Sequence, residues 1–142
     1  MNAYSRITMH VEVPVVRITL NHPPLNVIDI PMMEELRAAL AEAEANTGVS
    51  VVVLAGSGKA FSAGVDVAAH TPEQVADMLE KFHAIFRAIV ASRKVLVAEV
   101  RGQCLGGGAE LAMVCDVVVT SESARWAFPE IHLGCLPPVA AT

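Results

Sequence analysis

The sequence predicts an α/β layered fold with right-handed crossovers, and three observations support this prediction. Short β-branched runs alternate with longer segments of helical periodicity, which is typical of strands that are connected through helices. The 142 residues are 54% hydrophobic but only 4% aromatic, so aliphatic side chains must form the core, and these suit layered packing. No internal repeat, low-complexity stretch or linker is recognisable, and we therefore expect one domain over residues 1–142.

A hairpin and a helix open the chain. Residues 6–13 and 15–20 are β-rich runs separated by a proline, and the Asn-His-Pro-Pro sequence after them breaks the pattern. From Pro31 the apolar positions follow a helical period, with Asp29 near the start and Gly48 just beyond the end. The core-facing positions of this helix are expected to be Met32, Met33, Leu36, Ala39, Leu40 and Ala43. Its solvated face is expected to comprise Glu34, Glu35, Arg37, Glu42 and Glu44.

Two buried strands and a second helix follow. Residues 51–55 and 95–100 are continuously apolar or nearly so, as in strands that are covered on both faces. Residues 56–70 are expected to form a loop, and residues 71–73 (Thr-Pro-Glu) give an N-cap and first-turn pattern. The helical stripe after them is interpreted as core and comprises Val75, Met78, Leu79, Phe82, Ile85, Phe86, Ile89 and Val90.

The remaining elements are short. Residues 101–105 lead into the glycine run at residues 106–108 and a short helix that ends at about Cys115. Residues 116–119 form the next expected strand, and a brief segment at residues 126–128 precedes a Pro-Glu-Ile sequence.

The glycine run at residues 106–108 is the clearest indication of chemistry. Glycines without a Cβ let a ligand approach the backbone, and the first N–H groups of a helix have no intrahelical acceptor, so they can bind an anionic oxygen. Glu110 places a carboxylate one turn inside this helix, which suggests acid/base catalysis on a carbonyl compound. The alternative is structural: a packing point between helix and strand, with Glu110 as a solvated acid favoured by the helix dipole.

Charge and cysteine usage argue against several classes of protein. The formal charge of -5 and the single adjacent basic pair, Arg93-Lys94, make nucleic-acid binding improbable. No apolar run is long enough to span a membrane, and the N-terminus lacks a signal-peptide pattern, so we expect a cytoplasmic protein. Cys104, Cys115 and Cys135 are expected to be reduced thiols, and the five histidines lack the spacing of a metal site.

Three segments place glycines and acids in a distinctive order: residues 59–66 (KAFSAGVD), 102–112 (GQCLGGGAELA) and 129–134 (PEIHLG). Together they resemble the crotonase, or enoyl-CoA hydratase/isomerase, superfamily, and the resemblance covers nearly the whole chain. It implies a crotonase-like (ClpP/crotonase) spiral of ββα units that binds an acyl-CoA thioester. Family members continue into helices that complete the pocket and help to build trimers or hexamers. We therefore expect residues 1–142 to be a core truncated before the C-terminal helical region, and the full-length protein to be a homotrimer or hexamer.

The resemblance also implies roles for particular residues. The backbone N–H groups of Val65 and Gly107 are expected to bind the thioester oxygen, each stabilising its developing charge by about 3 kcal/mol in a dry pocket. Glu110 is expected to deprotonate water and Glu130 to protonate carbon, since such a pair works best with one acid ionised and one protonated. Further substrate-binding residues are expected to be Ala63, Gly64, Asp66, Gly106 and Gly108. No metal or cofactor is expected, because the thioester is the electron sink and coenzyme A belongs to the substrate.

Four polar residues near these segments have two interpretations each. Asp66 is better explained as a loop cap than as a catalyst. Lys59 either approaches a CoA phosphate or is solvated, and we favour the second interpretation. Glu99 and Arg101, in a segment where the family usually has Ala-Val-Asn-Gly, are either exposed strand-end charges or a pair near the ligand channel.

The chain departs from the common family pattern after Gly134. Common members continue with Pro-Gly-Ala-Gly-Gly-Thr, whereas residues 135–142 read Cys-Leu-Pro-Pro-Val-Ala-Ala-Thr. Because proline fixes φ and removes an N–H donor, the wall around the acyl end is expected to be stiffer. Together with residues 24–29 (Pro-Leu-Asn-Val-Ile-Asp), this segment looks like the cyclohexa-1,5-diene-1-carbonyl-CoA hydratases of anaerobic aromatic degradation.

The resemblance therefore predicts a lyase: an acyl-CoA hydratase that adds water to an α,β-unsaturated, and in that subfamily cyclic dienoyl, CoA thioester. In an enoyl-CoA isomerase, the first alternative, Glu130 would shuttle the proton and Glu110 would be dispensable, so the presence of both acids favours hydration. The second alternative is a catalytically silent subunit that binds acyl-CoA or serves assembly. Such a subunit would keep the geometry of Val65 and Gly107 but would not turn over substrate. The apolar surface left open by absent helices is expected to cause association, and activity of the 142-residue piece alone is doubtful.

Overall fold

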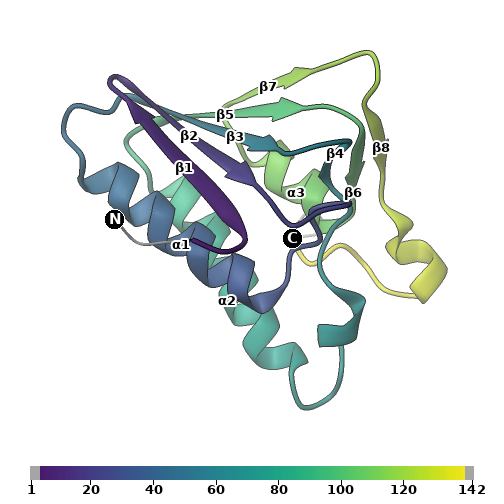
Figure 1. Cartoon of the computed structure of the whole chain (residues 1–142). Helices are drawn as coiled ribbons and strands as arrows, with labels where there is room; N and C mark the ends of the chain where they lie inside the picture. The colour runs from purple at the N-terminus through teal and green to yellow at the C-terminus, as the bar shows by residue number, and fades with distance from the viewer. Residues whose placement is uncertain (1–3, 140–142) are drawn as a thin grey trace.

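The computed structural model describes residues 4–139 and confirms the α/β fold (Figure 1). A five-stranded sheet has the order β1-β2-β3-β5-β7, and a three-stranded sheet has the order β4-β6-β8. The pair β1 and β2 is antiparallel, and the other pairs of named strands are parallel. The strands are β1 (Ile7–Glu12), β2 (Val15–Leu20), β3 (Val51–Gly56), β4 (Ala60–Ser62), β5 (Val95–Val100), β6 (Gln103–Leu105), β7 (Val117–Thr120) and β8 (Arg125–Ala127). The helices are α1 (Ile30–Ala45), α2 (Val75–Val90) and α3 (Gly107–Met113), with the 3-10 helices η1 (Val67–Ala69) and η2 (Pro129–Leu133).

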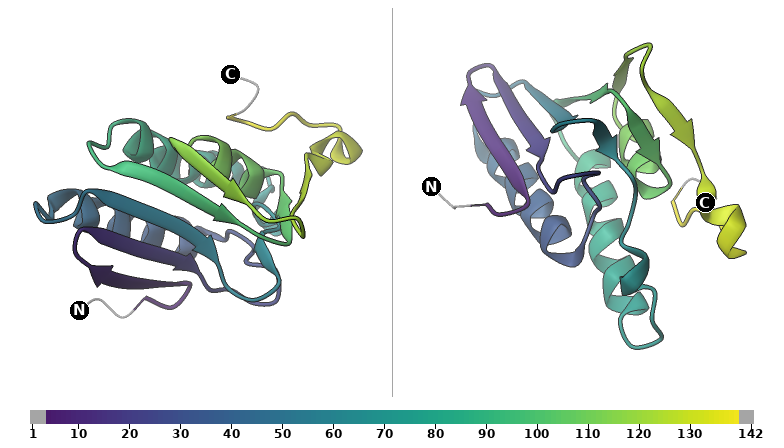
Figure 2. Two further views of the ribbon diagram at one scale, coloured as in Figure 1. Left: turned by 90° about the horizontal axis from the view of Figure 1, so that it is seen from above. Right: turned by 45° about the vertical axis from the view of Figure 1, so that its right-hand side comes forward.

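After the hairpin, one structural unit repeats along the chain. Each unit has a strand in the large sheet, a strand in the small sheet and a helical segment: β3-β4-α2, β5-β6-α3 and β7-β8-η2. Helices α1, α2 and α3 lie on one side of the large sheet (Figures 1 and 2). The units form the expected ββα arrangement, although no sequence repeat marks them. Strand β4 lies in the segment that was predicted to be a loop, and β6 lies in residues 101–105, for which no element was predicted, because three residues are too few to establish a strand pattern.

Two glycines allow the chain to pass from the large sheet into the small one. Gly56 ends β3, and a methyl group at this position would overlap the backbone of Ala60 and Phe61. Gly102 precedes β6 with a φ of 62°, and a methyl group there would overlap the carbonyl group of Lys59. The two corners are therefore in direct backbone contact, which requires glycine at both positions.

Side chains along the long strands alternate between a buried face and a more open one. The buried residues of β2 are Val16, Ile18 and Leu20, and those of β5 are Leu96, Ala98 and Val100. The prediction that both faces are covered holds in part for residues 51–55, where Val51 and Val53 are half-buried and Ala55 is buried, and is wrong for residues 95–100, where Val95 is exposed. Valine occupies both faces of these strands, so the sequence lacks the polar alternation that reveals an open face. In the described part of the chain β1 and β7 are the edge strands of the sheet, and all four residues of β7 are exposed.

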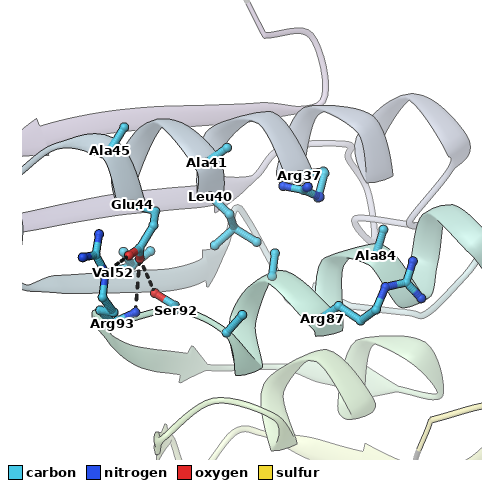
Figure 3. A pocket seen from close by; sticks show the side chains of 12 residues that line it. Arg37, Leu40, Ala41, Glu44, Ala45, Val52, Ala84, Arg87, Ser92 and Arg93 are labelled. Atoms are coloured by element: carbon cyan, nitrogen blue, oxygen red, sulfur yellow. Dashed lines mark hydrogen bonds and ion pairs between the residues drawn. The ribbon is translucent and has the colours of Figure 1, made fainter.

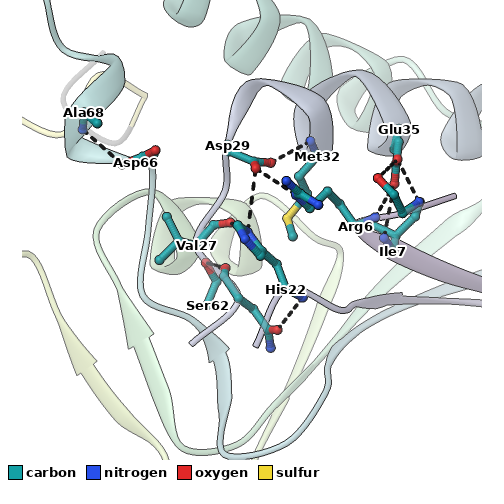
Figure 4. Close-up of polar contacts among 12 residues, drawn as sticks. Arg6, Ile7, His22, Val27, Asp29, Met32, Glu35, Ser62, Asp66 and Ala68 are labelled. Carbon is teal, nitrogen blue, oxygen red and sulfur yellow. Dashed lines mark hydrogen bonds and ion pairs between the residues drawn. The ribbon is translucent and has the colours of Figure 1, made fainter. Parts of the chain in front are cut away.

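Helix α1 forms as predicted. Its N-cap is Asp29, whose side chain accepts the N–H group of Met32 at 2.9 Å, and all six expected core residues are buried. Glu35 was expected to be solvated, but it accepts the backbone N–H groups of residues 5–7 (Figure 4). Burial acts to raise the pKa of Glu35, but these donors outweigh burial and hold the pKa below its usual value. Glu35 thus attaches the start of the hairpin to α1.

Helix α2 begins later than predicted. The expected N-cap, Thr71, instead closes a turn in which its carbonyl group accepts the N–H groups of Gln74 and Val75. Most of the predicted stripe is buried, but Val90 at its end is 75% exposed. The apolar periodicity therefore predicted the position of the helix correctly, but it wrongly included Val90 in the buried face.

Helices α1 and α2 pack against each other beside a groove of about 520 Å³ (Figure 3). At one end of the groove Glu44, also expected to be solvated, accepts hydrogen bonds from Arg93 Nε and Ser92 Oγ, both at 2.8 Å. The Arg93 guanidinium and the Ser92 hydroxyl lower the pKa of Glu44 to about 2. The lining combines alanine and aliphatic side chains with charged ones, and since Arg93 is paired with Glu44 and Arg87 with Glu80, we assign this region to stability.

Replacing Glu44 with Gln is expected to destabilise the fold at neutral pH because the variant loses the ion pair with Arg93. The folded-state pKa of Glu44 is depressed, so its stabilisation is present above about pH 4.5 and is lost as the pH falls towards about 2. The difference in urea midpoint between wild type and Glu44→Gln should therefore shrink over that range. Glu73→Gln, at an exposed position, serves as the control. A difference that does not vary with pH would contradict this account of Glu44.

Candidate active site

The three short parallel strands bring the predicted site segments together. Residues 63–65 follow β4, residues 106–107 follow β6 and residues 128–130 follow β8. Because β4, β6 and β8 are parallel, their carboxyl ends lie at the same edge of the small sheet. Open α/β sheets bind ligands at this kind of edge.

A cavity of about 290 Å³ lies at this edge. Its lining contains seven of the nine predicted site residues: Ala63, Gly64, Val65, Gly106, Gly107, Glu110 and Glu130. Asp66 and Gly108 do not belong to the lining. Gly108 packs against Ser62 instead, since a methyl group on it would lie 2.7 Å from the Ser62 carbonyl oxygen.

The backbones of Val65 and Gly107 lie against each other. A methyl group on Gly107 would lie 2.7 Å from Val65 Cγ2 and 3.4 Å from the Val65 amide nitrogen, and one on Gly64 would lie 3.4 Å from the Gly107 nitrogen. Within residues 4–139 neither the Val65 nor the Gly107 N–H group has a hydrogen-bond acceptor, whereas the N–H groups of Ala63, Gly64 and Asp66 each have one. Two neighbouring backbone donors are therefore available to a ligand oxygen.

Glu110 is the only charged residue among those described that is buried, with 2% of its surface exposed. Its Oε1 atom accepts the N–H group of Val139 at 2.7 Å, so the segment after η2 folds back onto the helix that carries this acid. Its own N–H group donates to the Gly106 carbonyl at 3.0 Å. The solvated-acid interpretation of Glu110 is therefore wrong, and the packed glycine helix places the acid in the cavity.

Glu130 reaches the same cavity from η2. A methyl group on Gly106 would overlap Glu130 Oε1, so the carboxyl group lies directly against the Gly106 Cα atom. Glu130 Oε2 is buried and has no hydrogen-bond partner among the described residues. Buried polar atoms are normally satisfied by protein, water or ligand, so an acid in this state is a candidate for direct contact with a reactant.

Several features of the cavity were not predicted. The α2 stripe was interpreted as core, but Val75, Met78, Leu79 and Phe82 also line the cavity. An apolar helix face has the same sequence pattern whether it packs against protein or ligand, so no signal separated the two cases. The contact between Val139 and Glu110 joins residues that are 29 positions apart, and no local pattern reveals such a contact.

Three other polar residues have structural positions. Asp66 accepts the Ala68 N–H group at 3.0 Å and caps η1, which confirms its interpretation as a loop cap (Figure 4). Lys59 is exposed. Glu99 forms an ion pair with Arg17 of β2 at 2.7 Å, so it does not pair with Arg101 at the ligand cavity.

The described cysteines are free thiols. Burial raises the pKa of Cys104 and of Cys115 to about 12, so both stay protonated at neutral pH. Residues 4–139 contain no group of three His, Cys, Asp or Glu side chains that could hold a metal ion. No helix in this part of the chain has the length and apolar character that crossing a membrane requires.

A family model described as enoyl-CoA hydratase/isomerase matches residues 11–142. The chain belongs to this family. The matched range contains all three segments that carry the resemblance and every residue that lines the cavity.

Individual members of the enoyl-CoA hydratase/isomerase family support the same conclusion. The "Probable enoyl-CoA hydratase" of Rhizobium meliloti (strain 1021) is 40% identical over 140 residues, which cover 95% of this chain and 53% of that protein. The cyclohexa-1,5-dienecarbonyl-CoA hydratase of Thauera aromatica is 35% identical over 125 residues, which cover 88% of this chain and 48% of that protein. A Legionella pneumophila structure described as an enoyl CoA hydratase/isomerase (crotonase) has a TM-score of 0.89 at 34% identity, covering 96% of this chain and 56% of that one. The chain thus has the crotonase fold and spans about half the length of the curated relatives it matches.

An alanine at residue 107 is expected to disturb the cavity of this family member. The added methyl group would lie 2.7 Å from Val65 Cγ2 and 3.0 Å from Phe82 Cζ, and overpacking of this kind costs about 1–3 kcal/mol. Because the methyl group and the displaced Val65 and Phe82 side chains would narrow the cavity, binding of a saturated acyl-CoA should weaken by about tenfold or more in calorimetric titration. Gly48→Ala is the control, because its nearest new contact would be 3.3 Å at an exposed site. Unchanged affinity in Gly107→Ala would argue against acyl-CoA in this cavity.

Proposed function

We propose that the protein acts as an acyl-CoA hydratase, a lyase that adds water across the α,β double bond of an enoyl-CoA thioester. One observation carries the proposal: the acids Glu110 and Glu130 line one cavity together with Val65 and Gly107, whose N–H groups have no acceptor within residues 4–139. Adding water across the double bond of an enoyl thioester requires three components: hydrogen-bond donors that bind the carbonyl oxygen, a base that takes a proton from water, and an acid that protonates the α-carbon.

In the proposed reaction the N–H groups of Val65 and Gly107 bind the thioester oxygen. Addition of water to the β-carbon makes the α-carbon enolate-like and moves negative charge onto that oxygen. Fixed backbone donors stabilise this charge more in the transition state than in the ground state, which lowers the barrier. Since the donors are backbone groups, the valine side chain at residue 65 is not itself required for this step.

The two acids divide the proton transfers. Glu110 accepts a hydrogen bond from the Val139 N–H group and lies in the first turn of α3, and both features stabilise a negative charge. Glu130 Oε2 is buried without a hydrogen-bond donor among the described residues, so this oxygen is available to contact the substrate. These contacts support Glu110 as the base that takes a proton from water and Glu130 as the acid that delivers one to the α-carbon.

The acyl group is proposed to lie between α2 and the segment after η2. Phe82 and Met78 of α2 line one part of the cavity, and Leu136 and Pro138 line another. The two consecutive prolines at residues 137–138 make this second wall stiff. A stiff apolar wall suits a compact ring, and the Thauera aromatica relative is named for a cyclic dienoyl substrate. We therefore include a cyclic dienoyl-CoA among the proposed substrates.

The proposal requires coenzyme A only as a part of the substrate. The thioester carbonyl accepts the electron pair, so the chemistry needs neither a metal ion nor a redox cofactor. We further propose a homo-oligomer, because β7 and η2 expose apolar side chains that association would cover, and we retain the cytoplasmic location expected from the sequence as part of the proposal. These side chains are Val117, Val118, Val119, Ile131 and Leu133.

Replacing Glu110 or Glu130 with Gln is expected to lower the hydration rate by about 10²–10⁴-fold, because each variant loses one proton transfer. Binding of a saturated acyl-CoA should be retained, since the Val65 and Gly107 donors are unchanged. The assay uses the longest natural chain that contains this sequence, with crotonyl-CoA and a cyclic dienoyl-CoA, and follows loss of the double bond. Near-normal turnover in either variant would contradict the assigned role.

The same experiment separates hydration from the alternatives. Glu122→Gln, at an exposed position outside the cavity, is the matched control and should retain full activity. An isomerase would move the double bond without adding water and would tolerate Glu110→Gln. A catalytically silent subunit would bind acyl-CoA without turnover even as wild type. Either result would overturn the hydratase proposal.

A further inference from the structure

Asn26 has an unusual backbone conformation for a buried residue. It is fully buried, and its φ of 52° is the only positive φ of a non-glycine residue within residues 4–139. This left-handed conformation is unfavourable for most side chains, but asparagine tolerates it better than most. The position therefore requires a residue that combines this backbone geometry with a polar side chain.

The Asn26 side chain connects separate parts of the chain. Its Nδ2 atom donates to the carbonyl groups of Ser57, Ala60 and Phe61 at 3.0, 2.9 and 3.2 Å. Its Oδ1 atom accepts the His22 N–H group at 3.0 Å. A single amide group thus fixes the segment at residues 22–26 against the corner that leads into β4.

The backbone around Asn26 then holds the loop after β4. The Asn26 carbonyl accepts the Ser62 hydroxyl at 2.7 Å, and Ser62 Oγ in turn accepts the Gly64 N–H group at 3.0 Å. The Leu25 carbonyl accepts the Ala63 N–H group at 2.9 Å. Residues 25–28 therefore run beside residues 62–66 and bond to polar groups of that loop other than the Val65 N–H group.

The orientation of the Val65 N–H group follows from these bonds. The Gly64 carbonyl accepts the Ile28 N–H group at 2.8 Å, and the Asp66 N–H group donates to the Ile28 carbonyl at 3.0 Å. The peptide bond between residues 64 and 65 is trans, and in a planar trans peptide the C=O and N–H groups point in opposite directions. The Val65 N–H group therefore points away from residues 25–28.

We propose that Asn26 is the positioning residue that aims the Val65 N–H group at the substrate carbonyl. The inference rests on the proposed hydratase function, in which that N–H group binds the thioester oxygen. Asn26 does not belong to the cavity lining, so it acts through Ser62 and the backbone of residues 25–28 rather than by touching the substrate. A misaimed donor weakens mainly the transition-state contact, so the expected effect is on kcat rather than on binding.

The test uses variants that separate positioning from folding. Asn26→Gly keeps a residue that accepts positive φ but removes the side-chain bonds, and Asn21→Gly at an exposed neighbouring position is its control. Ser62→Ala removes only the link between the Asn26 carbonyl and the Gly64 N–H group, and it carries the test if Asn26→Gly does not fold. The readouts are kcat, KM and the infrared stretching frequency of an isotope-labelled thioester carbonyl in bound butyryl-CoA, each normalised to folded protein.

Positioning by Asn26 predicts a loss of about 10–100-fold in kcat with little change in KM, because removal of an entire oxyanion donor costs about 10²–10³-fold. The carbonyl frequency, lowered on binding to wild type, should return towards the value of free butyryl-CoA in both variants. Variants that melt earlier but keep the wild-type frequency and kcat would overturn this inference and leave the hydratase proposal intact. If wild type itself does not shift the carbonyl frequency, the proposed oxyanion contact fails, and the inference fails with it.

Discussion

The parallel alignment of three very short strands is the constraint on which the site depends. β4, β6 and β8 have three residues each, too few to persist as an isolated sheet. They are held from outside: backbone contact between the Gly56 and Gly102 corners fixes where β4 and β6 begin, and Asn26 binds the carbonyl groups beside β4. The large sheet and its helices therefore provide the stability, while the small sheet provides the geometry.

The cavity departs from the packing rules that the rest of the core obeys. Burying an acid in apolar surroundings costs stability unless donors compensate it, and Glu110 receives the Val139 N–H group from a distant segment. Glu130 keeps a buried oxygen without a donor in the described chain. Groups arranged in this way are expected where reactivity is retained at the expense of stability. Glu44 differs from these two acids, because its exposed ion pair with Arg93 only joins two elements. We therefore treat Glu110 and Glu130 as catalytic candidates and Glu44 as a structural acid.

Local physics explains which features could be predicted from the sequence. Helix α1 has a strong apolar period and a capping aspartate, and its six core positions were identified correctly. The glycines at residues 106–108 indicated a close backbone approach, and the cavity lies there. Strands of three residues, the open face of the large sheet and the apolar lining from α2 could not be predicted. Each of these features depends on neighbours that are distant in sequence. A valine or leucine gives the same sequence pattern whether it packs against protein, faces an open surface or lines a cavity.

Gly106 touches both acids, and this limits how the protein can change. Its carbonyl accepts the Glu110 N–H group, its Cα atom lies against Glu130 Oε1, and its φ of 50° excludes most side chains. The spacing between the acids is therefore set by main-chain atoms that no ordinary substitution can adjust gradually. New specificity is more readily acquired through Leu133, Leu136 and Pro138, whose side chains border the cavity and form no hydrogen bond with either acid. Proteins that diverge on such a scaffold should therefore catalyse the same reaction on different substrates.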